Sequence, residues 1–156
     1  MANPLTTRRE GDCFRFFLTL EEPAAAPEDA ARLSGLLAPF LDEKRVEAFA
    51  AAAIHTALEE LLTNLGKFGR PASGAPPEPA SLTAEGEIMV NAPGTVLRLI
   101  DNGIEFNPAL RPPPVFPDNP EQLVPGGLGL HMLQTMFSSF SHSRENGKNV
   151  GVWTIR

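Results

Sequence analysis

The sequence has almost no cysteine, no concentrated basic charge and no long apolar run. Its single cysteine, Cys13, cannot form a disulfide within the chain, so a disulfide-stapled scaffold is excluded. The 13 Lys and Arg residues are scattered through a chain of formal net charge -6, which argues against nucleic-acid binding. The first residues, MANPLTTRREGD, contain no secretory apolar segment, and no membrane span follows them. We therefore expect a cytoplasmic protein.

The length and composition of the chain fit one domain over residues 1–156. A chain of this length can bury about 70% of its unfolded surface, which is enough for an apolar core. Hydrophobic residues make up 42% of the chain and charged residues 21%, so disorder over the whole chain is excluded. Most of the 16 prolines fall in two clusters, at 70–81 and 107–127, and these clusters divide the regular elements.

The first half of the chain predicts a strand and two helices. Alternating apolar residues predict a strand over Phe14–Leu20. Helical spacing from about Glu28 predicts a helix that Pro39 ends or kinks, and hence a short one. After Asp42, a candidate cap, a nearly unbroken i, i+3, i+4 apolar pattern predicts a long helix over Val46–Leu65.

The second half predicts a hairpin, a helix and a last strand. The hairpin pairs residues 81–90 with 95–100, and a helix begins near Leu128. The proline-rich stretch 107–126 between them is too long for a routine connection, so we interpret it as a lid or binding loop. After the turn at Asn146-Gly147 the chain forms a final strand. We expect an α/β (α+β) two-layer sandwich, with helices on one face of a mixed, largely antiparallel sheet.

Three polar features could carry chemistry, and the first lies on the long helix. Glu60, Asn64 and Lys67 project from one edge of its apolar stripe, whereas Glu59 points toward solvent. A carboxylate, an amide and an ammonium there could hold a polarised hydroxyl, a cation and a phosphate. The same spacing also fits the solvated flank of an ordinary amphipathic helix.

The second feature is Asp101-x-Gly103, directly after an apolar strand. The carboxylate could accept a hydrogen bond from an exocyclic amine, and the glycine would let a flat ligand approach the backbone. The alternative is an Asn-Gly hairpin turn, although the following NPALRPPP offers no returning strand.

The third feature is the glycine cluster Gly126–Gly129, where the proline-rich loop enters the last helix. Free backbone amides at a helix start form a phosphate cradle. The alternative is a flexible joint. The pattern matches neither the P-loop nor GxGxxG.

In this order the motifs resemble the N box and the two glycine boxes of the Bergerat-fold (GHKL, HATPase) ATP-binding domain. They are Glu60-x-x-x-Asn64, Asp101-x-Gly103 and Gly127-x-Gly129. Within that superfamily, the segments EELLTNLGKFG, DNGIEFNP, GGLGLHMLQTMF and ENGKNV are similar to anti-sigma-factor serine/threonine kinases of the RsbW kind. The resemblance extends from about Phe14 to the last residue and implies the Bergerat fold.

The resemblance implies ATP and Mg²⁺ as cofactors and assigns roles to four polar residues. Asn64 would coordinate the magnesium ion that bridges the phosphates, and Glu60 would orient or deprotonate the attacking hydroxyl. Lys67 would contact a phosphate, and Asp101 would accept a hydrogen bond from the adenine amino group.

It also implies backbone access at Gly103, Gly127 and Gly129, the last two at the base of an ATP lid over about 107–126. His131 follows the lid glycines and could reach a phosphate, although a histidine on a helix is more often a surface residue.

Two departures from the family pattern bear on nucleotide affinity. Glu105 replaces a second glycine that is common in the first glycine box. Asn149 lies near the place where many members have a threonine that helps to bind adenine. We interpret Cys13 and His55 as structural, and no metal site built from side chains alone is expected.

These features support three hypotheses on function. The first is a stand-alone serine/threonine protein kinase of a partner-switching system, which phosphorylates a STAS-like anti-sigma-factor antagonist and binds a sigma factor or another regulatory target. The second is a nucleotide-gated interaction module without significant kinase activity, and the motifs do not separate the two. The third, a sensor histidine kinase, is disfavoured because no histidine precedes His55 and no phosphoacceptor domain fits. A homodimer is left open.

Overall fold

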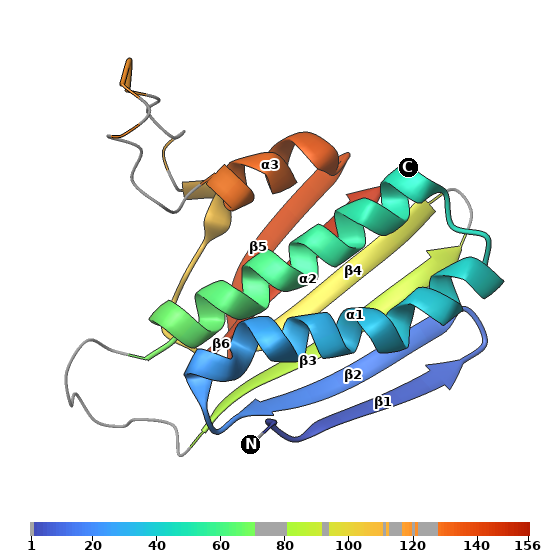
Figure 1. The fold of residues 1–156 in the computed structure, drawn as a ribbon, viewed down its shortest axis with the longest axis horizontal. Coiled ribbons are helices and arrows are strands. Elements are labelled where there is room, and N and C mark those ends of the chain that lie inside the picture. Colours follow the sequence, from blue (N-terminus) through green and yellow to red (C-terminus); the bar gives the residue numbers. More distant parts are fainter. Residues whose placement is uncertain are drawn as a thin grey trace.

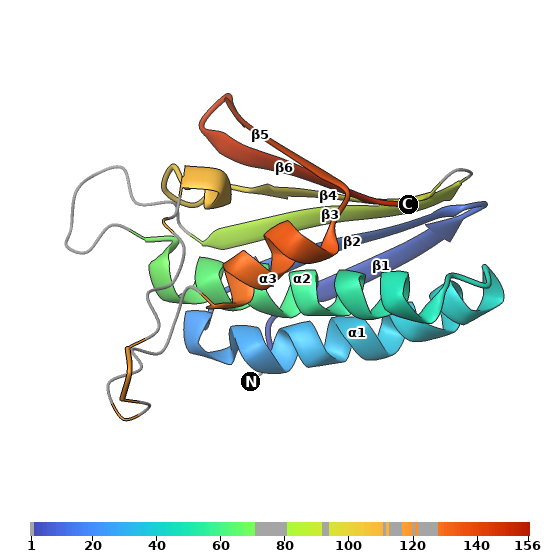
Figure 2. The same cartoon turned by 90° about the horizontal axis from the view of Figure 1, so that it is seen from above.

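The protein folds as a six-stranded sheet with its helices on one face, as Figures 1 and 2 show. The computed structural model describes residues 2–70, 81–91, 94–110, 112, 117–119, 121 and 128–156. The elements are β1 (Leu5–Glu10), β2 (Cys13–Leu20), η1 (Pro23–Ala25), α1 (Ala26–Glu43), α2 (Ala48–Phe68), β3 (Leu82–Asn91), β4 (Gly94–Asp101), η2 (Pro108–Leu110), α3 (Leu128–Met136), β5 (Ser139–Glu145) and β6 (Lys148–Ile155).

The strand order is β1-β2-β3-β4-β6-β5, and each of these neighbouring pairs is antiparallel. Figure 2 shows α1, α2 and α3 on the same side of the sheet, with α3 beside α2. The two-layer α+β sandwich expected from the sequence is therefore confirmed. None of the helices in the described part of the chain is long and apolar enough to cross a membrane.

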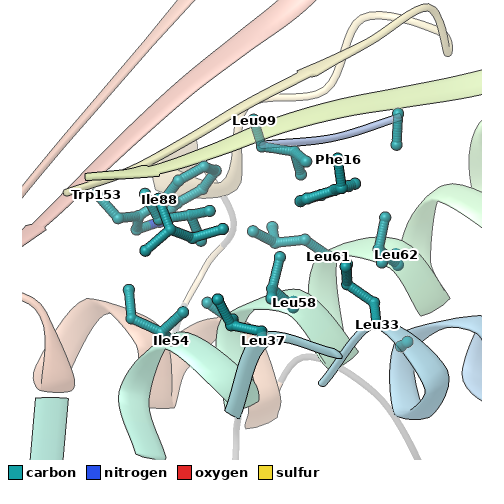
Figure 3. Packing of buried hydrophobic residues seen from close by; sticks show 14 of the residues in the cluster. Phe16, Leu33, Leu37, Ile54, Leu58, Leu61, Leu62, Ile88, Leu99 and Trp153 are labelled. Carbon is teal, nitrogen blue, oxygen red and sulfur yellow. The ribbon is translucent and has the colours of Figure 1, made fainter. Parts of the chain in front are cut away.

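The core lies between the sheet and the apolar faces of α1 and α2. Figure 3 shows the side chains of the two helices meeting those of the strands. Full burial of one such side chain stabilises the fold by about 1.5–3 kcal/mol. The labelled members are Phe16, Leu33, Leu37, Ile54, Leu58, Leu61, Leu62, Ile88, Leu99 and Trp153.

Helix α1 is longer than expected, since it has 18 residues and continues through Pro39 to Glu43. Proline removes one backbone hydrogen bond, but Phe40 and Leu41 beyond it are fully buried in the core. Their burial outweighs the lost bond and holds the last turn in place. Asp42 consequently lies inside α1 and does not cap α2.

Two strands, β1 and β5, were missing from the predicted layout. Both lie at the ends of the strand order, and each pairs with one neighbour among the described strands. Their sequences, LTTRRE and SFSHSRE, are mostly polar and exposed. An edge strand that buries few side chains shows no apolar alternation, so the sequence carries little signal for it.

The β3–β4 hairpin and the helix from Leu128 are confirmed. The register of the sheet then brings separate parts of the chain together. Asp101, the last residue of β4, lies opposite Asn149 of β6, and Asn149 lies opposite Arg144 of β5. This row crosses three strands at the same end of the sheet.

Candidate functional site

A pocket of about 100 Å³, which opens to solvent, is lined by residues of the C-terminal half of α2 and of the strands β4, β6 and β5. Figure 1 shows where these elements lie in the fold. Most of its lining is apolar, with a few polar groups, which is typical of small-molecule sites. The lining residues are Leu61, Asn64, Leu65, Phe68, Gly69, Leu99, Asp101, Ile104, Phe106, Pro108, His142, Asn149, Gly151 and Trp153.

Asp101 supplies the carboxylate of the pocket. Its Oδ1 accepts two hydrogen bonds, from the backbone N–H of Gly103 at 2.9 Å and from Nδ2 of Asn149 at 2.9 Å. Within the described residues, no group donates to its Oδ2. One oxygen is therefore fixed by the protein, and the other is available to an N–H donor of a ligand.

Burial raises the pKa of the Asp101 carboxyl above its ordinary value. The hydrogen bonds from Asn149 and Gly103, and the neighbouring Arg144 and His142, offset only part of this effect. The ionised form is therefore costly in this pocket, and a donor bound at Oδ2 would reduce that cost.

Gly103 lies in a closely packed position. A Cβ at this position would lie 2.9 Å from Cδ1 of Leu65 and 3.0 Å from Oδ1 of Asp101. The next residue, Ile104, donates its N–H to the carbonyl of Gly69 at 2.9 Å, which ties this loop to the end of α2. The hairpin alternative is wrong, because β4 pairs next with β6 and the chain after Gly103 leads to η2.

Glu60 and Asn64 lie one turn apart on α2. Nδ2 of Asn64 donates to Oε1 of Glu60 at 3.1 Å. This bond fixes the amide, and no donor in the described part of the chain occupies Oδ1 of Asn64. An amide oxygen is a ligand that Mg²⁺ accepts. Glu59 is exposed on another face of the helix, as expected.

The carboxylate of Glu60 also touches the start of α3. A Cβ at Gly129 would lie 2.1 Å from Cδ of Glu60, so this position accepts only glycine while Glu60 keeps its place. Gly129 of the glycine motif at the start of α3 therefore lies against Glu60 of the motif on α2. Gly127 and most of the predicted lid 107–126 lie outside the described residues.

Two expected phosphate contacts do not line the pocket. Lys67 is exposed in the last turn of α2, and His131 is half-buried on α3. Their roles stay predictions. No group of three His, Cys, Asp or Glu side chains that could hold a metal occurs among the described residues. A magnesium ion would therefore depend on Asn64 together with oxygens of a bound ligand.

Trp153 of β6 and His142 of β5 line the pocket, and the sequence did not predict this. The ring of Trp153 lies over Gly151, where a Cβ would come within 2.2 Å of it, and stacks on Phe140 with ring centroids 4.9 Å apart. His142 lines the pocket, and its buried Nε2 has no hydrogen-bond partner in the described chain. The only sequence signal for β5 was the polar segment SHSRE directly before an Asn-Gly turn.

Arg144 of β5 was also not predicted as a site residue. Its Nη1 donates to the carbonyl of Gly103 at 2.8 Å and to Oδ1 of Asn149 at 2.9 Å.

Comparison with known families gives one match. The model of the histidine kinase-like ATPase domain matches residues 24–153, which is most of the chain. No curated protein matches the sequence. The matched range includes all three motifs and the pocket.

Asp101→Asn is expected to weaken ADP binding by about 1.5–3 kcal/mol, the contribution of a hydrogen bond to a charged group. The new amide can still accept from Gly103 and Asn149, but its NH₂ replaces Oδ2 and opposes an amine donor. Titration calorimetry measures the change, with Glu85→Gln, an exposed carboxylate of β3 outside the pocket lining, as the control. Equal affinities of wild type and Asp101→Asn would contradict the adenine assignment.

The same variant is expected to unfold at an equal or higher temperature than wild type at pH 7.5. Because the folded pKa of Asp101 is raised, its contribution to stability is present below its ordinary pKa and is lost as the pH rises through the folded value. At pH 7.5 the buried charge is therefore a cost that the amide removes. Thermal unfolding without nucleotide, followed by circular dichroism, should show this advantage shrinking toward pH 4. A less stable variant at pH 7.5 would oppose this reading.

Proposed function

The chain belongs to the histidine kinase-like ATPase family, a GHKL-type ATP-binding fold, and on that premise we propose that it is a serine/threonine protein kinase. Its substrate is a STAS-like antagonist protein of a partner-switching system. The observation that carries the proposal is that Glu60 contacts both Gly129 and Asn64, and that Asn64 lines the pocket that also contains Asp101.

The adenine end of the nucleotide fits the sheet side of this pocket. Oδ2 of Asp101 accepts from the exocyclic amine, while apolar side chains such as Leu65 and Ile104 flank a flat base. Gly103 does not line the pocket, and its expected role in backbone access stays a prediction; its N–H holds Oδ1 of Asp101.

The phosphates fit the region where α2 meets α3. Asn64 is the residue suited to hold magnesium, and the N-terminal end of the nine-residue α3 favours negative charge. A bound magnesium ion supplies neutralisation of the phosphate charge. Lys67 and His131, which lie outside the pocket lining, are the further candidate phosphate contacts.

Glu60 is the candidate base for phosphoryl transfer. The serine or threonine hydroxyl oxygen forms a bond to the γ-phosphorus, and the bond from that phosphorus to the bridging oxygen breaks, with its electron pair leaving on ADP. The hydroxyl proton goes to the Glu60 carboxylate. Positioning is the main requirement of this reaction, and the Asn64 amide fixes one carboxylate oxygen of Glu60.

The choice of partner rests on the motif resemblance. The segments EELLTNLGKFG and DNGIEFNP both surround residues of the pocket and are similar to those of anti-sigma-factor kinases. We therefore propose a sigma factor, or another regulatory protein, as the second binding partner and the cytoplasm as the location.

Glu60→Gln is expected to retain ATP binding and to lose phosphoryl transfer by about 10²-fold or more, as removal of a general base does. Glu59→Gln is the matched control, since its exposed side chain points away from the pocket and transfer should stay near wild type. The assay combines the protein, labelled ATP, magnesium and STAS-like proteins encoded beside it. An active Glu60→Gln with an inactive Glu59→Gln would overturn the assignment. Wild type that binds ATP but labels no partner would favour the nucleotide-gated interaction module.

Gly129→Ala is expected to lower transfer while the fold remains stable. The new Cβ would clash with the carboxylate of Glu60, and the flexible end of that side chain can move away. Displacement breaks its hydrogen bond to Asn64 and misplaces the base. Transfer rate and thermal unfolding temperature are compared with those of wild type. Gly35→Ala, at a helical glycine with open space around it, is the control. Unchanged transfer in Gly129→Ala would remove Glu60 from the chemistry.

A further inference from the structure

Asn149 is 5% exposed and uses its whole amide within the protein. Nδ2 donates to Oδ1 of Asp101 at 2.9 Å and to the carbonyl of Ile104 at 2.8 Å. Oδ1 accepts from the backbone N–H of Phe106 at 3.1 Å and from Nη1 of Arg144 at 2.9 Å. An amide has two donors and two acceptor positions, so nothing remains for a ligand.

Arg144 completes this arrangement from the neighbouring strand. It lies directly opposite Asn149 in the β5–β6 register. The same Nη1 that donates to Asn149 also donates to the carbonyl of Gly103 at 2.8 Å. One guanidinium nitrogen thus joins β5 to β6 and to the loop after β4. Arg144 does not line the pocket.

The four partners fix which way the amide points. Two acceptors, Asp101 and the Ile104 carbonyl, face its NH₂ group, and two donors, Arg144 and the Phe106 N–H, face its oxygen. A rotation of the amide by 180° would place its oxygen against the carboxylate, and the four hydrogen bonds of the amide would be lost. Loss of hydrogen-bond partners by buried polar groups is unfavourable, so the amide keeps this orientation.

We propose that Arg144 and Asn149 are positioning residues that select the base of the nucleotide: together they hold Oδ1 of Asp101, so that Oδ2 alone meets the base, and neither hydrogen-bonds to it. The proposal rests on the ATP-binding function proposed above. A carboxylate oxygen held in this way accepts from the 6-amino group of adenine and repels the 6-oxo group of hypoxanthine. Loss of the bracket, meaning the Arg144–Asn149 pair, leaves Oδ1 of Asp101 held by the Gly103 N–H alone, which allows the carboxylate to turn and lowers this discrimination.

The test compares ADP with inosine diphosphate, which carries a 6-oxo group, by titration calorimetry with magnesium. Wild type should bind ADP at least tenfold more tightly. Arg144→Met keeps the long stem without the donor, and it should lower ADP affinity about tenfold while inosine diphosphate affinity stays within twofold. Arg144→Lys, whose ammonium can donate to both acceptors, should restore most of the ratio. Arg98→Met removes an equal charge from an exposed position of β4 and should match wild type.

A double-mutant cycle separates positioning from direct contact. Asn149→Ala should lower the affinity ratio as Arg144→Met does, and the double variant should be no worse than either, because both changes break the same bracket. Additive losses would show that Asn149 contacts the base itself and would overturn the proposal.

Equal losses of both nucleotides in Arg144→Met, or no loss, would overturn it as well. If Arg144→Met does not fold, Asn149→Ala and Arg144→Lys supply the same comparison. If wild type binds ADP and inosine diphosphate with equal affinity, the proposed selection of the base is wrong, whereas the proposed nucleotide binding is supported. Wild type that does not bind ADP would overturn the proposed function together with this inference.

Discussion

The packing of α2 on the sheet is the constraint on which the site depends. Leu58 and Leu62 are fully buried, and they fix the rotation of the helix about its axis. A helical residue turns by about 100° relative to its neighbour, so this rotation decides which of Glu59 and Glu60 meets α3. The same apolar contacts that stabilise the fold therefore place the candidate base.

The sheet provides the second half of the site through its register. Asp101, Asn149 and Arg144 come from three strands, yet they form one row because β4, β6 and β5 pair in order. A slip by one residue would turn these side chains to the opposite face. The buried apolar alternation of β4 and β6 opposes such a slip, so core packing also fixes the hydrogen bonds of a polar cluster.

The parts of the fold that could be predicted are those in which burial leaves a pattern in the sequence. The periodicity of α2 and the β3–β4 alternation gave the elements, and motif spacing then gave Glu60, Asn64 and Asp101. Helix α1 was predicted too short because the burial of residues beyond Pro39 is a tertiary effect. Arg144 could not be found, since its role depends on an edge strand without an apolar pattern and on partners far away in the chain.

The location of Arg144 on an edge strand has a thermodynamic consequence. Within the described chain, β5 is hydrogen-bonded on one side only, to β6, so it is expected to open at a lower free energy than the interior strands. When β5 frays, the loop after β4 loses one tie to the sheet, the hydrogen bond from Arg144 to the carbonyl of Gly103. A nucleotide that needs this tie then stabilises β5 by mass action, and amide exchange along β5 reports base occupancy from outside the pocket. Ligand affinity and strand opening are in this way linked equilibria.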